Sequence, residues 1–305
     1  MSLQVATSWP RVEKASASSA SGAKGLYAMA DRLSPKLRKR FLAAIRGVAA
    51  TVDLDALAAA FAGRQFDRLD DILNLRDIPK SLASSAATII ECFQRGGLLS
   101  ADALAAALKI GPLVFDLKNP RAVAWAKQSS AALVTEISTS AREALRTLTA
   151  QGLAHGIAPV ETARLMRASI GLTDRQAMAV MNYRFALLEQ GRTPEDVARL
   201  AERYSAQLLN YRARVIARNE TLTAAHMGQQ QAWQQATDQG LLNPDQTRRR
   251  WSVAMDDRTC PICLPMHGQE VAFSGEPFLT GDGDPVDLPP AHVMCRCAVG
   301  LVIDA

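Results

Sequence analysis

The stretch NPRAVAWAKQSSAALVTEISTSAREALRTL, residues 119–148, predicts a long amphipathic helix. Asn119-Pro120 is a typical helix start, because a proline in the first turn loses no intrahelical hydrogen bond. Beyond it, small or apolar residues recur at spacings of three and four, at Val123, Ala126, Ser130, Leu133, Ile137, Ala141, Ala144 and Leu148. Residues at these spacings share one side of a helix, so we expect a continuous apolar face.

Helix signals continue downstream of this stretch. Pro159 suits the start of a shorter helix that ends near Gly171, and Thr173 with Gln176 forms a capping-box pattern. Thr193-Pro194 then begins a helical pattern that reaches Gly240. Because this pattern exceeds the length of most globular helices, we expect either a break within residues 205–210 or a projecting strut.

The upstream half of the chain also has a helical pattern, from about residue 26 to residue 110. Residues that end or interrupt helices divide it, and they are Gly63, Pro79, Gly96-Gly97 and Gly111-Pro112. Hydrophobic residues make up 48% of the 305 residues but aromatic residues only 5%, which favours helices packed through small side chains. We therefore expect a mainly α protein. The sequence has no signal-peptide pattern and no membrane-spanning apolar run, so we expect no membrane partner and a location in the cytoplasm in which it is made.

The C-terminal residues have a different pattern. Arg250–Met255, Gly268–Phe273 and Ala298–Ile303 are typical of short strands, with loops rich in Gly, Pro and Asp between them. The predicted fold is therefore a mainly α protein with a long-helix region followed by a small cysteine-rich α+β module. We predict four segments, namely a mobile basic arm at 1–25, a helical N-terminal domain at 26–115, a helical region at 116–242 and the module at 243–305.

Positive charge is concentrated near the N-terminus. Residues 1–50 contain nine Lys or Arg and two acidic residues, a net charge of +7, whereas the whole chain has a net charge of +5. The densest cluster is Lys36, Arg38, Lys39 and Arg40. Clustered cations bind polyanions by releasing counterions, so this cluster predicts contact with DNA or an acidic partner. A solvated helix face is the competing interpretation.

The strongest chemical signal is Cys260-Pro-Ile-Cys263 followed by His292-Val-Met-Cys295-Arg-Cys297. A CxxC turn presents two thiolates to one ion, and a CxC pair on an extended segment points both sulfurs to the same face. We therefore predict a structural zinc site with Cys260, Cys263, Cys295 and Cys297 as ligands. His292 is an alternative ligand and His267 a more distant one. Two disulfides, or reduced thiols that only pack, are the competing interpretations. The remaining cysteine, Cys92, is predicted to be a buried apolar residue.

Motifs in the second half of the chain resemble the phage head-morphogenesis family of Mu F-like minor head proteins. The C-terminal motifs are Asp256 or Asp257 followed by RTCPIC at 258–263, then Gly268, then PPAHVMCRC at 289–297. The helical motifs are NPRAVAWA at 119–126, LVTEI at 133–137 and RVIARNET at 214–221. These motifs place the resemblance over residues 115 to 300.

The resemblance implies a minor head protein that acts in procapsid assembly and performs no catalysis. Its location would be the virion, in the capsid interior or at the portal vertex. Its partners would be the portal protein, the major capsid or scaffold protein, and packaged DNA. Arg214 and Arg218, one helical turn apart, would then join Lys36, Arg38, Lys39 and Arg40 as candidate contacts for DNA or portal.

Two other functions compete with this interpretation. A zinc-containing nucleic-acid-binding protein would suit a metal module beside a basic segment. However, residues 264–294 contain five acidic residues and no Lys or Arg, which is a poor surface for phosphate. A Cys/His hydrolase is the second alternative. Four cysteines within residues 260–297 disfavour it, because they would quench one another through a metal or disulfides.

Overall fold

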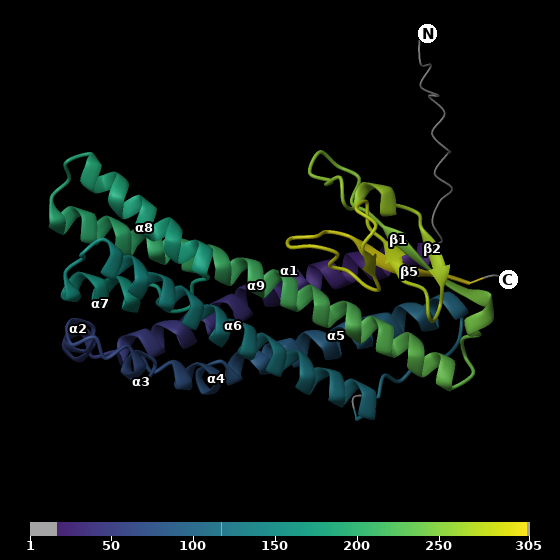
Figure 1. The fold of residues 1–305 in the computed structure, drawn as a ribbon. Coiled ribbons are helices and arrows are strands. Elements are labelled where there is room, and N and C mark those ends of the chain that lie inside the picture. The colour runs from purple at the N-terminus through teal and green to yellow at the C-terminus, as the bar shows by residue number, and fades with distance from the viewer. Residues whose placement is uncertain (1–16, 117, 304–305) are drawn as a thin grey trace, which may run out of the picture. The chain divides into compact units, whose positions relative to one another are not determined.

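The computed structural model of the protein describes residues 17–116 and 118–303, and most of them are helical (Figure 1). The helices are α1 (Ala17–Ala50), α2 (Leu54–Ala62), α3 (Leu69–Ile72), α4 (Ile78–Ser81), α5 (Ala83–Leu108), α6 (Pro120–Ala154), α7 (Pro159–Ala168), α8 (Asp174–Glu189) and α9 (Pro194–Asp238). The strands are β1 (Thr247–Ser252), β2 (Glu270–Ala272), β3 (Phe278–Leu279), β4 (Pro285–Val286) and β5 (Ala298–Ile303). The predicted mainly α fold with a small C-terminal sheet is confirmed.

The chain forms two compact units, each built from stretches that are far apart in the sequence. Among the described residues, unit 1 comprises 17–28, 96–115 and 226–303, and unit 2 comprises the rest. One unit boundary, between Phe115 and Asp116, coincides with a predicted segment boundary, whereas the others fall inside α1, α5 and α9. The four predicted segments stay a prediction. Of the predicted arm at 1–25, residues 1–16 lie outside the described residues, and α1 begins at Ala17.

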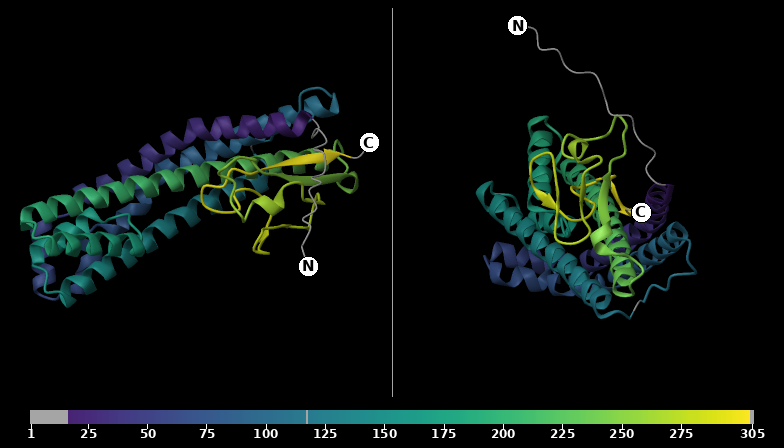
Figure 2. Two further views of the ribbon diagram at one scale, coloured as in Figure 1. Left: turned by 90° about the horizontal axis from the view of Figure 1, so that it is seen from above. Right: turned by 90° about the vertical axis from the view of Figure 1, so that its right-hand side faces the viewer.

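Unit 2 is a bundle organised around α6. This helix packs against α7 and α8, and α2 packs against α7 (Figure 2). The predicted apolar face of α6 is buried in its second part, at Leu133, Ile137, Ala141, Ala144 and Leu148. Val123 at the start of that face is 38% exposed. None of the helices in the described residues is long and apolar enough to cross a membrane.

The predicted capping box is confirmed at the start of α8. The backbone N–H of Gln176 donates to Thr173 Oγ1 at 3.3 Å, and the Thr173 N–H donates to Gln176 Oε1 at 3.1 Å. This reciprocal pair satisfies two donors that the first helical turn leaves without partners.

The expected break in α9 was wrong, because the helix runs without interruption from Pro194 to Asp238. At the expected position the helix is packed instead of projecting. Ser205 is buried and its hydroxyl donates to the carbonyl oxygen of Ala168 at 2.7 Å, and Leu209 is also buried. Tertiary packing of this kind stabilises a long helix more than the helix propensity of its residues does.

The expected interruption at Gly96-Gly97 was also wrong, because both residues lie inside α5. Gly97 is needed there for a close approach and not for a break. A Cβ on Gly97 would lie 2.2 Å from Cε1 of Phe115, whose ring packs directly on the helix backbone. Phe115 is only 4% exposed, so this contact belongs to the apolar core of unit 1.

The C-terminal module in unit 1 contains a three-stranded antiparallel sheet in the order β2-β1-β5, and a separate β3-β4 hairpin. The three predicted strands are thereby confirmed within a few residues. Trp251 on β1 and Phe278 on β3 are both fully buried and meet edge to face, with ring centroids 5.0 Å apart. Met266 and Phe273 complete a small apolar core.

Substitution of Gly97 by Ala should destabilise the protein by roughly 1–3 kcal/mol, because the added methyl group overlaps the Phe115 ring. Gly47→Ala in α1 is the matched control, since a Cβ there meets nothing within 4 Å and should add roughly 0.5–1 kcal/mol through helix propensity. Urea unfolding followed by circular dichroism measures both changes. Equal stability of the Gly97→Ala protein and the wild type would refute the close contact.

Candidate metal centre

The pairing of β1 with β5 brings the two cysteine pairs together. In this pairing Ser252, the last residue of β1, lies opposite Ala298, the first residue of β5. Cys297 directly precedes β5, and the loop that leaves β1 reaches Cys260 within eight residues. The antiparallel register therefore places the CxxC turn and the CxC segment at the same end of the sheet.

An ion pair fastens these two segments beside the cysteines. Arg296, between the two cysteines of the CxC segment, donates two hydrogen bonds of 2.5 Å to the Asp256 carboxylate. Asp256 Oδ1 also accepts the backbone N–H of Arg258 at 3.0 Å. The Arg296 guanidinium holds the pKa of Asp256 well below its usual range. Sequence reasoning assigned no role to this pair, although both residues stand in the motifs that flank the cysteines.

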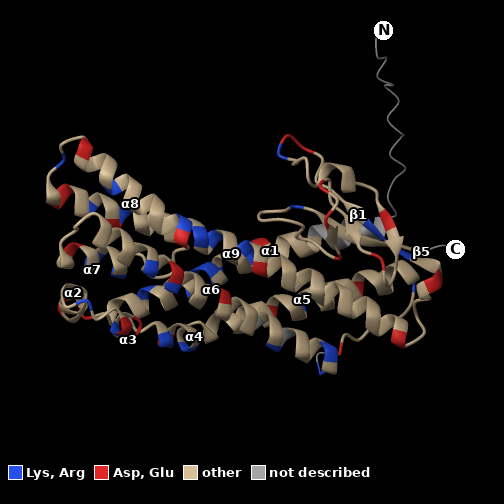
Figure 3. Ribbon diagram, in the orientation of Figure 1, with Lys and Arg blue, Asp and Glu red and all other residues tan. Residues whose placement is uncertain are grey.

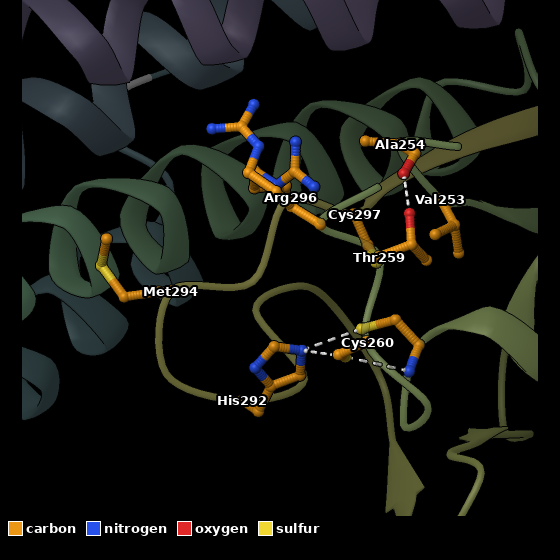
Figure 4. A pocket seen from close by; sticks show the side chains of 10 residues that line it. Val253, Ala254, Thr259, Cys260, His292, Met294, Arg296 and Cys297 are labelled. Carbon is orange, nitrogen blue, oxygen red and sulfur yellow. Dashed lines mark hydrogen bonds between the residues drawn. The ribbon is translucent and has the colours of Figure 1, made fainter. Parts of the chain in front are cut away.

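The cysteine and histidine side chains form two groups that share Cys263. Cys260, Cys263 and His292 form one group, and Cys263, Cys295 and Cys297 form the other. His292 Nε2 lies 3.1 Å from Cys260 Sγ and 3.0 Å from Cys263 Sγ (Figure 4). Cys263 Sγ lies 3.8 Å from Cys295 Sγ. These groups could hold a metal ion, and they contain the four predicted cysteine ligands and the alternative ligand His292.

The imidazole of His292 is oriented by its other nitrogen. Nδ1 lies 2.9 Å from the carbonyl oxygen of Val293, which can only accept a hydrogen bond. Nδ1 therefore carries the proton, and in the neutral ring Nε2 presents a lone pair to the two sulfurs. A backbone carbonyl in this position is a common outer partner of a metal-binding histidine.

The sulfurs of Cys295 and Cys297 differ in their surroundings. Cys295 Sγ accepts from the Cys297 thiol and from the Cys297 backbone N–H at 3.4 Å, and these bonds lower the pKa of Cys295. The pKa of Cys297 is raised, first because its thiol donates to Cys295 and then because it is buried. The buried indole N–H of Trp251 donates to the Cys297 sulfur, which lowers the pKa of that thiol against the larger effects of Cys295 and burial. A thiolate at Cys297 would be a stronger acceptor for that N–H.

The cluster meets solvent at Cys260 and His292. Cys263, Cys295 and Cys297 are buried, whereas Cys260 and His292 are partly exposed and line a small pocket of about 30 Å³ (Figure 4). His267, the more distant candidate, joins neither group, and its Nδ1 accepts the backbone N–H of Val253 at 3.2 Å. Cys92 is buried in α5 as expected, and burial raises its pKa to about 12.

The predicted DNA or portal contacts lie on α1 and α9 of unit 2, and Figure 3 shows the basic segments along α9. Four of the six side chains form hydrogen bonds or ion pairs within the unit, and one of them is Arg38, which donates to Asn210. Lys36 Nζ lies 2.5 Å from Glu91, and Arg218 Nη1 lies 3.0 Å from Asp31. Arg40 donates to the carbonyl oxygen of Ser84 at 2.8 Å. Lys39 is exposed.

Within the RVIARNET motif at 214–221, no sequence signal indicated that Glu220 is a partly buried carboxyl group with a raised pKa. This residue is partly buried on α9, and its pKa is raised to about 7, first by burial and then by the negative charge of Glu136. A raised carboxyl pKa means that the folded state binds the proton more tightly than the unfolded chain does. The free energy of unfolding should therefore fall as the pH rises from the ordinary pKa of a glutamate to about 7.

We expect Glu220→Gln to raise the free energy of unfolding at about pH 8 by up to about 3 kcal/mol, because glutamine fills the same space without a charge. Near pH 4 the gain should vanish, since Glu220 is then protonated in both states. Denaturant unfolding across this pH range measures the difference. Glu136→Gln serves as the control and should give a smaller gain in stability, because it removes only the negative charge near Glu220 and leaves Glu220 buried. A loss of stability in Glu220→Gln at every pH would contradict the assignment.

Comparison with known families gives one match. Residues 186–300 match the family model described as Phage Mu protein F like protein. The matched residues run from the end of α8 through α9 and most of the C-terminal module, and they include all five side chains of the cluster. The motifs at 119–126 and 133–137 lie outside them. No curated protein and no solved structure matches the chain. Residues 186–300 therefore form a Phage Mu F-like region, which confirms the resemblance of this chain to the phage head-morphogenesis family.

Proposed function

We propose that this chain is a minor head protein that acts during phage head assembly, at the portal or in the capsid interior. The match of residues 186–300 to the Phage Mu F-like family carries the proposal. The portal protein and the major capsid or scaffold protein are the proposed partners, and packaged DNA is within reach of a protein in that location. The proposed locations are the assembled virion and, before assembly, the host cytoplasm.

We further propose that the cysteine cluster binds one zinc ion. Zinc lies about 2.3 Å from a cysteine sulfur and about 2.0–2.1 Å from a histidine nitrogen. A tetrahedral ion therefore separates two sulfurs by about 3.8 Å, and a sulfur from a nitrogen by about 3.5 Å. The 3.8 Å between Cys263 and Cys295 fits the first value. His292 Nε2, at 3.0 and 3.1 Å from its sulfurs, would move outward by roughly 0.5 Å to admit the ion.

The proposed ligands are Cys260, Cys263 and His292, with the fourth ligand supplied by the Cys295 and Cys297 pair. Cys260 and His292 lie with Cys263 in one group, whereas the two CxC cysteines lie in the other. This set differs from the four sulfurs predicted from the sequence by including the histidine. The orientation of His292 through Val293 supports its inclusion, because the ring presents the lone pair that a metal needs.

A structural role for the ion, and no catalytic activity, complete the proposal. A catalytic zinc keeps one position for water, whereas the two groups that share Cys263 offer five candidate ligands, enough to fill all four positions of one ion. A Cys/His hydrolase would need a nucleophile that substrate can reach. Cys263, 3.0 Å from His292, is only 3% exposed, and the partly exposed Cys260, at 3.1 Å, would be bound to the ion and not free as a nucleophile. Metal binding would instead hold the CxxC turn against the start of β5 and stabilise a module with a small apolar core.

We expect the purified protein to contain about one zinc ion per chain, measured by plasma mass spectrometry. Cys263→Ala should abolish zinc binding, because Cys263 belongs to both groups. Cys92→Ala removes a buried thiol outside the cluster and is the matched control, which should retain the metal. His292→Ala should also lose zinc, whereas a four-sulfur site would keep it.

Two further measurements test this site. Cys295→Ala and Cys297→Ala, compared with each other, show which sulfur is the fourth ligand. Chelation followed by hydrogen exchange should increase exchange in residues 250–303 and leave unit 2 protected. Zinc-free protein with unchanged exchange throughout would exclude a structural metal.

The proposed location makes a prediction about particles. Quantitative mass spectrometry of gradient-purified heads and procapsids from the phage that encodes this chain should find a few copies per portal. Cys263→Ala phage should incorporate fewer copies if the module makes the docking contact, and Cys92→Ala phage should match the wild type. Absence of the protein from both kinds of particle would rule out the proposed function.

A further inference from the structure

An open pocket of about 250 Å³ lies between α1 and α9 in unit 2. Its lining side chains are Arg38 from α1 and Gln207, Asn210, Tyr211 and Arg214 from α9. All five carry hydrogen-bonding groups, and four of them can donate through an N–H. The pocket therefore presents donors from two helices to one volume of solvent.

The two arginines of this pocket have no acidic partner among the described residues. Neither forms an ion pair among the described residues, and no carboxylate lines the pocket. The neighbouring cations on the same helices differ in this respect, because Lys36 pairs with Glu91 and Arg218 pairs with Asp31. The positive charge of the pocket is therefore not neutralised within the unit.

Neutral groups hold both guanidinium groups in place. Arg38 Nη2 donates to Asn210 Oδ1 at 3.2 Å, and the Asn210 amide is itself fixed by donating to the Ala206 carbonyl at 2.7 Å. The guanidinium carbon of Arg214 lies 5.2 Å from the centre of the Tyr211 ring. Stacking and amide contacts orient a guanidinium group without cancelling its charge. Two oriented cations that face one space repel each other until an anion enters it.

We propose that Arg38 and Arg214 form a binding site for a phosphate of the DNA backbone. The planar fork of arginine matches phosphate oxygens, and the pocket holds a group of that size. Tyr211 is 52% exposed beside Arg214, so a sugar or base next to the bound phosphate could contact its ring. The open mouth suits a continuous backbone better than an enclosed small molecule. This inference rests on the proposed function in the head, and it names the DNA backbone as a partner.

Binding to a short fluorescent DNA duplex, measured by anisotropy at several salt concentrations, tests the site in the full-length protein. Arg214→Gln should weaken binding several-fold, and the Arg38→Gln, Arg214→Gln double variant should weaken it further. The slope of log affinity against log salt should fall by about 0.9 for each phosphate contact that is lost. Arg203→Gln removes one charge from an exposed position of α9 outside the pocket and should change both quantities less.

Competitors identify the source of the anion. Inorganic phosphate should displace the duplex only at high concentration, and polyglutamate of matched charge should displace it poorly. Efficient displacement by polyglutamate would overturn the assignment to DNA in favour of an acidic protein. Equal losses of affinity in Arg214→Gln and Arg203→Gln would also overturn it, because binding would then depend only on the overall positive charge of α9. Arg214→Lys, which keeps the charge and the fold, should recover part of the affinity but not the wild-type value. Because head incorporation is measured separately, a failed binding test leaves the assignment as a minor head protein intact.

Discussion

The meeting of two loops at Cys263 is the constraint on which the C-terminal module depends. The sheet supplies only the approximate position, because the β1-β5 register brings the loop after β1 and the segment before β5 to one end. Side chains then complete the contact, through the sulfurs around Cys263 and through the two hydrogen bonds from Arg296 to Asp256. Without these contacts the loops from 253 to 269 and from 287 to 297 would have only a small apolar core to order them.

Much of the fold was readable from local patterns, because these report local physical requirements. The capping box at Thr173 and Gln176 and the run of apolar, often β-branched residues in the last strand are decided by neighbouring residues. The errors arose where a distant residue decides the outcome. Gly97 was expected to interrupt a helix because its own propensity is poor, yet Phe115 packs in the space that its missing side chain leaves. No sequence pattern near Gly97 contains that information.

In the candidate metal site, too, local sequence patterns predicted some features, whereas others depend on the folded structure. The spacing of the cysteines predicted which side chains meet, but it could not rank His292 against the sulfurs. That ranking depends on the Val293 carbonyl, which fixes the ring, and on the loop conformation that carries it. The basic residues give a similar lesson. Lys36, Arg40 and Arg218 were indistinguishable from Arg38 and Arg214 in the sequence, because Glu91, Ser84 and Asp31 are remote partners.

The hydroxyl of Tyr27 donates to the carbonyl oxygen of Cys297, which lies 270 residues away in the chain. Unit 1 also combines the beginning of α1, the end of α5 and the C-terminal module. During synthesis on the ribosome, Tyr27 can therefore form this hydrogen bond only after Cys297 has been added to the chain. Contacts of such large sequence separation form late, since a long loop must close before they contribute. A chain truncated before Cys297 would therefore lack the carbonyl acceptor of the Tyr27 hydroxyl, and α1 would lose this link to the C-terminal module.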